Sequence, residues 1–424
     1  MAAGSTIVSI VAREVFSQRG HPGVEATVTT ENGARGVAVV SGGKSVGKHE
    51  VRYVYDGGRR WNGLGVQKAV GNIEKEIAPA LRGLDAVRQR EVDETLIRLD
   101  GTPDKSRLGG NALAAVSAAV LKAGAASLGI PLYQHIGGVN ACILPVPGVI
   151  AVYGSTRYGG GKRAGGKPSY AFLSHGFATF REASYACWEV REAFEALLRE
   201  KYDLMTRVGF EPLPIPPGVV SHDRELWELM AAAIDRAGHG GRIGLHVDIA
   251  ACCFYDASTD RFCGLFSAED KSREELMDLY RTMVSGYPFL ILEDPLDEDD
   301  YEGHAALTRE LGVEIVGDDL FTTNVERLRK GVETGACNAV LLKVNQIGTI
   351  SEAFDFVEVA RRNGYGVMPC SSRGEGPDIG DYAVGLGTGH VRECGLDHNT
   401  NRLLQIEAEL GSRARFLGRG GLKP

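Results

Sequence analysis

The sequence predicts a mixed α/β protein in which an N-terminal α+β capping domain, residues 1–140, precedes a (β/α)8 barrel, residues 141–424. A chain of 424 residues is longer than one ordinary hydrophobic core supports. Apolar and polar residues alternate within the first 60 residues, as in half-buried strands. After Pro145, apolar runs and helical segments alternate at steps of about 25 residues, the length of a β/α unit.

In the N-terminal part we expect strands at 23–29 and 36–40, joined by a turn at 31–33. Helical patterns follow at roughly 66–82, 87–98 and 110–128. The third of these helices is dense in alanine and other small residues. It is therefore expected to pack closely inside the domain core.

The barrel strands are predicted from five short apolar runs, most of which finish in a polar or charged residue. These runs lie at 243–248, 289–293, 313–318, 339–343 and 364–368, with helices between them such as 323–334 and 350–363. The step from Asp248 to Glu293 is longer than the others and leaves room for a hairpin around 256–262.

Composition restricts the class of function. Hydrophobic residues make up 43% of the chain and charged residues 24%, as in a soluble globular protein. The net charge of −8 argues against nucleic acid as the main partner. The eight cysteines show no disulfide framework, and neither a signal peptide nor a membrane-spanning run is expected. These features predict a cytoplasmic protein.

Three carboxylates and one lysine are expected to meet at one end of the barrel. Asp248, Glu293, Asp318 and Lys343 finish four successive strands, and the carboxyl ends of barrel strands surround a single site. Three carboxylates in one pocket repel one another unless a cation lies among them, and hard oxygen ligands suit Mg²⁺. Lys343 would face a substrate near that ion, with a pKa lowered toward that of a usable base. The alternative is that each acid only caps the following helix, which explains one acid more readily than all of them.

Several motifs resemble those of the enolase family, over essentially the whole chain. They are VDIAA at 247–251, LEDP at 292–295, GDDLFTTN at 317–324 and LKVNQIGT at 342–349, with further matches at 17–22, 100–106, 109–112, 131–133 and 404–411. The resemblance implies an enolase-type barrel. It also implies that Asp248, Glu293 and Asp318 bind Mg²⁺ and that Lys343 removes the proton α to a carboxylate. Glu211 would then act as the acid on the departing hydroxyl, and Ser41 would reach a second Mg²⁺.

The loops depart from the enolase pattern. The loop that begins at Ser41 carries two additional lysines, Lys44 and Lys48, and the glycine-rich stretch 154–167 is longer and more basic, with Arg157, Lys162, Arg163 and Lys167. The family's second glutamate is missing, because the chain has Tyr-Ala-Phe at 170–172. After the fifth strand, Cys370, Ser371, Ser372 and Arg373 align with the family's Ser-His-Arg-Ser, so the histidine is lost and the arginine moves by one position. The family's later lysine is replaced by Arg392 or is lost. These basic residues, together with Ser41, Ser371 and Ser372, are the predicted substrate-binding set.

The departures favour a second or larger anionic substrate, because arginines and glycine-rich backbone bind phosphate and carboxylate groups. These departures make the chain similar in kind to carboxyphosphonoenolpyruvate synthase. This resemblance implies a transferase of phosphonate natural-product biosynthesis. Such an enzyme would act on 2-phosphoglycerate or phosphoenolpyruvate and use a CMP-activated phosphonoformate donor. The alternatives are a divergent true enolase (phosphopyruvate hydratase) and a catalytically inactive binding protein. The family resemblance further implies a homodimer.

Overall fold

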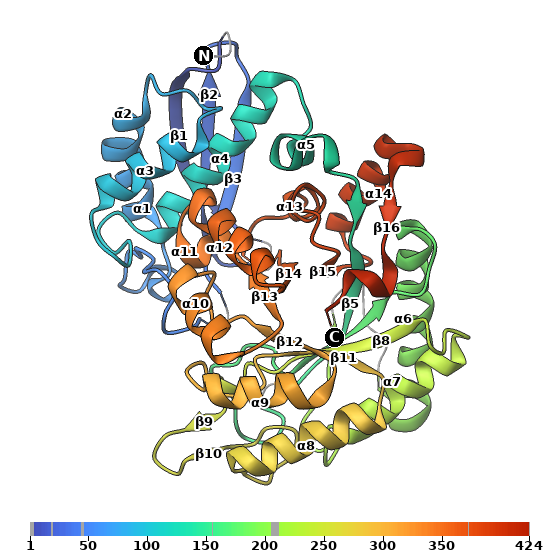
Figure 1. Ribbon diagram of the computed structural model, residues 1–424. Coiled ribbons are helices and arrows are strands. Elements are labelled where there is room, and N and C mark those ends of the chain that lie inside the picture. The colour runs from blue at the N-terminus through green and yellow to red at the C-terminus, as the bar shows by residue number, and fades with distance from the viewer. Residues whose placement is uncertain are drawn as a thin grey trace.

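The computed structural model describes residues 4–17, 20–43, 46–154, 156–204, 212–371 and 373–423. Its first part is a three-stranded antiparallel sheet covered by helices (Figure 1). The elements of this part are β1 (Ile7–Phe16), β2 (Pro22–Thr30), β3 (Arg35–Ser41), η1 (Arg60–Gly63), α1 (Gln67–Asn72), the π-helical turn η2 (Ile73–Ile77), α2 (Ala78–Leu81), α3 (Gln89–Asp100) and α4 (Gly110–Leu128). The expected strands and helices are all present, and the predicted single helix at 66–82 is divided by the π-helical turn.

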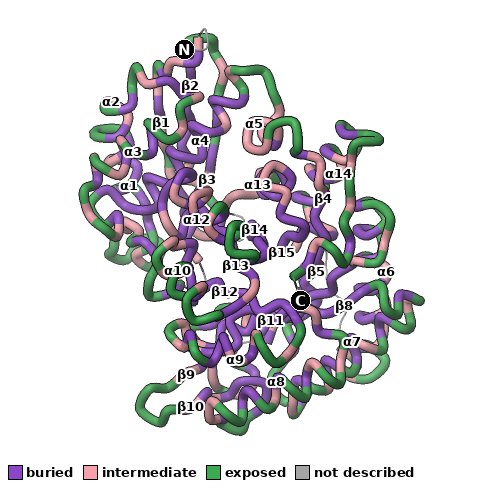
Figure 2. Tube along the Cα trace, in the orientation of Figure 1, coloured by how far each residue is buried: buried purple, intermediate pink, exposed green. Residues whose placement is uncertain are grey.

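Helix α4 forms the centre of the N-terminal part, as its alanine content predicts. It packs across β2 and β3, and nearly all of its residues are buried (Figure 2). Among the described residues, it is the one helix long and apolar enough to cross a membrane by length and composition. In that helix, 78% of the apolar window is buried inside the protein.

Gly36 of β3 is required for the close approach of α4 to the sheet. A Cβ atom at this position would lie 2.0 Å from the carbonyl oxygen of Ala119 and 2.4 Å from the backbone nitrogen of Ala123. Backbone atoms in a buried helix cannot yield easily, so we expect Gly36→Ala to lower the free energy of unfolding by about 1–3 kcal/mol. Urea titration measures this change. Gly71→Ala in α1 is the matched control: its Cβ meets nothing within 4 Å, and alanine there is expected to stabilise the helix. Equal stabilities of the two variants would contradict the prediction.

The second part of the chain is an eight-stranded barrel. Neighbouring strands follow the order β14-β13-β12-β11-β8-β6-β5-β15, and parallel bridges Val367–Gly389 and Cys370–Arg392 join the two ends. The eight barrel strands are β5 (Val146–Tyr153), β6 (Ser169–Ser174), β8 (Ile243–Asp248), β11 (Phe289–Glu293), β12 (Glu314–Gly317), β13 (Ala339–Leu342), β14 (Gly366–Pro369) and β15 (His390–Cys394). Outside these eight, β7 (Leu213–Pro214) pairs with β5, and two separate pairs are formed by β4 (Ile143–Leu144) with β16 (Arg415–Phe416) and by β9 (Tyr255–Asp256) with β10 (Arg261–Phe262). The predicted barrel and the predicted hairpin, β9–β10, are confirmed.

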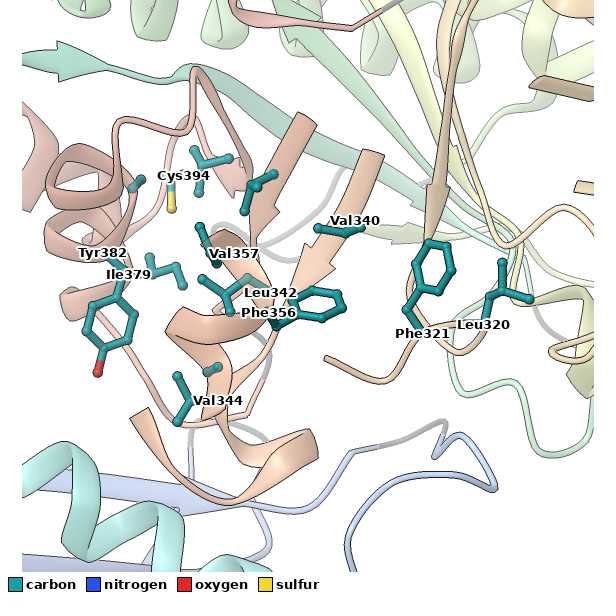
Figure 3. Packing of buried hydrophobic residues seen from close by; sticks show 14 of the residues in the cluster. Leu320, Phe321, Val340, Leu342, Val344, Phe356, Val357, Ile379, Tyr382 and Cys394 are labelled. Carbon is teal, nitrogen blue, oxygen red and sulfur yellow. The ribbon is translucent and has the colours of Figure 1, made fainter. Parts of the chain in front are cut away.

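Strand β6 differs from a regular β/α repeat, because it runs antiparallel to both β5 and β8. Helix α5 (Leu132–Gly137) and the 3-10 turn η3 (Gly138–Asn140) precede this part of the chain. Its own helices are α6 (Phe180–Tyr202), α7 (Arg224–Arg236), α8 (Arg273–Gly286), α9 (Tyr301–Leu311), α10 (Val325–Thr334), α11 (Val344–Ile347), α12 (Ile350–Arg362), α13 (Asp378–Leu386) and α14 (His398–Leu410), with short 3-10 turns η4 (Ala251–Cys253), η5 (Gly411–Arg413) and η6 (Gly418–Gly421). Apolar side chains fill the space between strands and helices. Figure 3 shows Leu342 of β13 beside Phe356 and Val357 of α12.

The two parts meet where α3 and α4 lie against α11 and α12 (Figure 1). Across this junction Arg90 donates hydrogen bonds to Asp355, and the Lys105 ammonium lies 3.0 Å from a Glu352 carboxylate oxygen. The backbone N–H of Val51 also donates to the carbonyl of Gln346. The loop that follows β3 is therefore held against the carboxyl end of β13.

Candidate active site

The four residues predicted from the strand ends do converge in the structure. Asp248 and Glu293 are the last residues of β8 and β11 and are direct partners in the parallel register. Asp318 follows β12, and Lys343 follows β13. All four side chains are buried, and the Lys343 ammonium contacts Asp318.

Cationic side chains balance these carboxylates. Lys167 and Arg392 both contact Asp248, and the Arg392 guanidinium also lies 3.3 Å from Glu293. His246, on β8, has its Nε2 atom 3.0 Å from the second oxygen of Glu293. Burial raises the pKa of Glu293, but Arg392 and His246 more than offset this, so the pKa lies below its ordinary value. Glu293 is thus held ionised between two neighbours.

Two opposing effects act on the pKa of Lys343 in the structure. Burial lowers this pKa, but the Asp318 carboxylate, with smaller contributions from Cys370 and Glu293, raises it by more, so the pKa lies above its ordinary value. The predicted fall requires a metal ion among the carboxylates and stays a prediction. Lys167 has a lowered pKa: burial and the Arg392 guanidinium bring it to about 8.

The strand-end carboxylates fit a hard divalent cation. Both Asp248 oxygens and Oε1 of Glu293 are buried, and among the described residues none donates a hydrogen bond of good geometry to them. Carboxylate oxygens of this kind suit Mg²⁺. Asp248, Glu293 and Asp318 would hold the ion, which remains a prediction.

Two further aspartates belong to this acidic centre, and the sequence analysis did not assign them. Carboxylate oxygens of Asp294, Asp318 and Asp319 lie within 4.8 Å of one another. Asp294 accepts backbone N–H groups of Asp318, at 3.0 Å, and of Asp319, at 2.8 Å. It thereby fixes the end of β12 relative to β11, which favours a positioning role. The signal was present in the sequence, because each aspartate directly follows a strand-end acid.

A buried polar chain leads from Asp318 to the loop after β3. Gln346 donates to Asp318 at 2.8 Å and accepts from Thr323 at 2.8 Å. Its amide also lies 3.5 Å from Glu50, which in turn binds the guanidinium of Arg373. Gln346 thus holds the Asp318 carboxylate in place. Arg373, predicted to bind substrate, is engaged by Glu50.

In the glycine-rich stretch, Arg157 is directed into the protein. Its guanidinium lies 3.1 Å from Asp223, and both side chains have no exposed surface. Tyr158 and Tyr170 also donate to Asp223, at 2.9 and 2.6 Å. This geometry favours an anchoring role for Arg157 over the predicted substrate contact. Asp223 and its three donors do not form a recognisable sequence motif, so the sequence analysis did not find this cluster.

The other predicted residues fall into three groups. Lys162 and Arg163 are exposed, and Lys48 forms ion pairs with Asp299 and Glu298. Ser41 and Ser371 are buried; the Ser41 N–H donates to the Arg373 carbonyl, and Ser371 Oγ lies 3.3 Å from Asn399. Lys44, Glu211 and Ser372 lie outside the described residues, so their predicted roles stay predictions.

A histidine–glutamate pair lies deeper in the barrel and predicts a pH effect on stability. His390 is fully buried, 3.3 Å from Glu314, and burial together with His246 lowers its pKa to about 3. The unfolded chain protonates this histidine near pH 6.5, so below that pH the unfolded state binds more protons and stability falls as pH falls. We expect His390→Gln to flatten the slope of unfolding free energy between pH 6.5 and 4.5, by up to about 1.4 kcal/mol per pH unit. Urea titrations at several pH values measure this; identical slopes would contradict it.

An α+β cap beside a closed barrel, with carboxylates and a lysine at successive strand ends, defines a barrel enzyme with a metal-type acidic centre. Residues 7–136 match the family model described as the enolase N-terminal domain, and residues 141–424 match the enolase C-terminal TIM barrel domain. The chain is 44% identical to the protein named Enolase of Methanopyrus kandleri, 42% to that of Methanocaldococcus jannaschii and 43% to that of Pyrococcus furiosus, each over 97% of both chains. The chain belongs to the enolase family and is an enolase-superfamily enzyme.

Proposed function

We propose that this chain is a Mg²⁺-dependent enolase that interconverts 2-phosphoglycerate and phosphoenolpyruvate. The observation that carries the proposal is the contact between Lys343 and Asp318 beside Asp248 and Glu293, all buried at adjoining strand ends. The name Enolase of the three relatives supports this reaction better than the phosphonate transferase predicted from the loops.

Each residue of the site has its own role in the proposed reaction. Asp248, Glu293 and Asp318 would hold Mg²⁺, and the bound ion would supply positive charge for the negative charge that develops on the substrate carboxylate. Once Mg²⁺ takes the place of Lys343 beside Asp318, the pKa of Lys343 would fall. The lysine would release its proton to solvent, and the neutral amine would then accept the C2 proton at its Nζ atom. Arg392 and Lys167, which already lie beside Asp248, orient the anionic groups of the substrate. Glu211 remains the predicted acid at the departing hydroxyl.

The decisive experiment mixes the purified protein with Mg²⁺ and 2-phosphoglycerate and follows the absorbance of phosphoenolpyruvate. Turnover of about 1–10³ s⁻¹ supports the proposal. If there is no turnover but C2 proton exchange into D₂O depends on Lys343, the proton-abstracting site is active and a different reaction follows it. Absence of both overturns the proposal and favours an inactive binding protein.

A second candidate is the transferase with a CMP-activated phosphonoformate donor. One observation favours it: a cavity of about 360 Å³ next to Arg373 is also lined by Lys48, Arg52, Tyr53 and Tyr55. Aromatic rings and cations suit a nucleotide. Against it, Lys48 and Arg373 are already paired with acids. Calorimetry with CMP and Mg²⁺ tests the candidate: binding that is lost in Tyr55→Ala supports it, and no heat of binding excludes this donor.

We also infer a cytoplasmic homodimer. All eight cysteines are free, as expected in a reducing compartment.

Phe16 and Trp61 are exposed and pack edge to face, with 5.1 Å between ring centres, which suits an interface between two copies of the chain. Light scattering coupled to gel filtration measures the mass; a monomer at micromolar concentration would overturn the inference.

A further inference from the structure

Two adjacent cysteines lie at the rim of the acidic centre, and the proposed reaction uses neither of them. Cys252 and Cys253 end the short turn η4, which follows β8 and its last residue Asp248. Both side chains are half-buried. Four other cysteines, at 187, 337, 370 and 394, are buried. Cys252 and Cys253 are thus two adjacent thiols that are both partly accessible to solvent.

The two thiol groups are adjacent in the chain and have different polar neighbours. Cys252 Sγ lies 3.5 Å from Asp319 Oδ2, and Cys253 Sγ lies 3.8 Å from the carbonyl oxygen of Arg163. The neighbouring Cys252 thiol, with smaller contributions from the cations Lys167 and Arg163, lowers the pKa of Cys253, whereas the pKa of Cys252 is raised. The two sulfurs are therefore chemically unlike, with Cys253 the better nucleophile.

We propose that Cys252 and Cys253 form a reactive dithiol, a modification site that a hydroperoxide oxidises to a vicinal disulfide. The Cys253 thiolate attacks the peroxide oxygen, the O–O bond breaks, and the alcohol or water leaves with one proton. Cys253 then carries a sulfenic acid. Cys252 passes its thiol proton to the Asp319 carboxylate, 3.5 Å away, and its sulfur attacks the Cys253 sulfur. The S–O bond breaks, and the departing hydroxide takes up that proton and leaves as water. Two thiols and one hydroperoxide thus give one disulfide, one alcohol (or water) and one water, and two electrons pass from sulfur to oxygen.

The disulfide would remove one hydrogen bond from the acidic centre. A Cys252 sulfur bonded to Cys253 has no proton to donate, so Asp319 loses its thiol partner at 3.5 Å. Asp319 lies in the same cluster as Asp318. Neighbours of metal ligands tune metal affinity about 10–100-fold, so we expect oxidation to weaken Mg²⁺ binding about tenfold. This consequence rests on the proposed Mg²⁺ site, whereas disulfide formation does not.

The test uses the full chain and hydrogen peroxide as the probe. After treatment, free thiols are alkylated and the protein is digested with trypsin. The peptide 243–261 contains Cys252 and Cys253 and no other cysteine. We expect this peptide to lose the mass of two hydrogens, to escape alkylation, and to recover both thiols after reduction. The half-buried Cys142 and Cys263, in other peptides, should remain alkylated and serve as internal controls.

Variants and metal titration complete the test. In Cys252→Ser we expect a sulfenic acid on Cys253 that dimedone traps, and in Cys253→Ser we expect no disulfide and no trapped Cys252. Two alkylated thiols in the treated wild-type peptide would overturn the proposal, as would oxidation that proceeds equally at Cys142 and Cys263. Calorimetric Mg²⁺ titration of the reduced protein tests the proposed function separately. Equal Mg²⁺ affinity of the reduced and oxidised forms would overturn the coupling to Asp319.

Discussion

Replacing Lys343 with alanine is expected to lower the turnover of 2-phosphoglycerate about a thousandfold, within the 10²–10⁴ range of a positioned proton-transfer group. The physical reason is that the Lys343 Nζ atom lies against Asp318 within the buried carboxylate set, at the end of β13. Lys167, another amine of the site, lies beside Asp248 at the end of β8 instead. Absorbance of phosphoenolpyruvate measures the loss, and C2 proton exchange in D₂O should be lost with it.

The Mg²⁺ affinity of Lys343→Ala distinguishes a variant that lacks only the base from one whose whole site is disrupted. Lys343→Ala removes a cation from Asp318, so Mg²⁺ affinity measured by calorimetry should be unchanged or higher than in the wild type. Lys75→Ala, at an exposed lysine of the N-terminal part, is the matched control and should retain full turnover. A Lys343→Ala enzyme within tenfold of wild-type turnover would exclude this lysine as the base.

The strand-end site was predictable because it depends only on where strands stop. Each of Asp248, Glu293, Asp318 and Lys343 follows a short apolar run, and in a barrel such positions meet without further information. The same logic located the alanine-rich helix α4 within its bounds. In both cases the determining pattern is local in sequence.

Side-chain partners were not predictable, because they come from distant parts of the chain. Arg157 and Lys48 looked like free cations on glycine-rich loops, yet Asp223 binds Arg157 across 66 residues and Asp299 binds Lys48 across 251. A count of basic residues therefore overstated the positive charge available to an anion.

Removing Asp223 is expected to have the largest effect on stability. The carboxylate is fully buried and accepts from Arg157, Tyr158 and Tyr170. Asp223→Ala would leave the Arg157 guanidinium buried without its counter-ion, which typically costs about 3–5 kcal/mol. The cost should appear as a lower free energy of unfolding in urea and as earlier proteolysis within 154–167, which Arg157 anchors. Glu358→Ala, which breaks an exposed ion pair with Arg362, is the control and should change stability by less than about 1 kcal/mol.

The double variant Arg157→Met with Asp223→Leu distinguishes the charge from the packing. If the loss in Asp223→Ala comes from an uncompensated guanidinium, two apolar side chains of similar length should recover most of it, because replacing both members of a buried pair is often neutral. The tyrosine hydroxyls would still lose their acceptor, so recovery should be incomplete. A double variant as unstable as Asp223→Ala would show that the hydrogen bonds of Tyr158 and Tyr170 dominate. Turnover of the recovered variant then decides the role of Arg157: full activity fits an anchor, and a raised KM at unchanged stability would restore the predicted substrate contact.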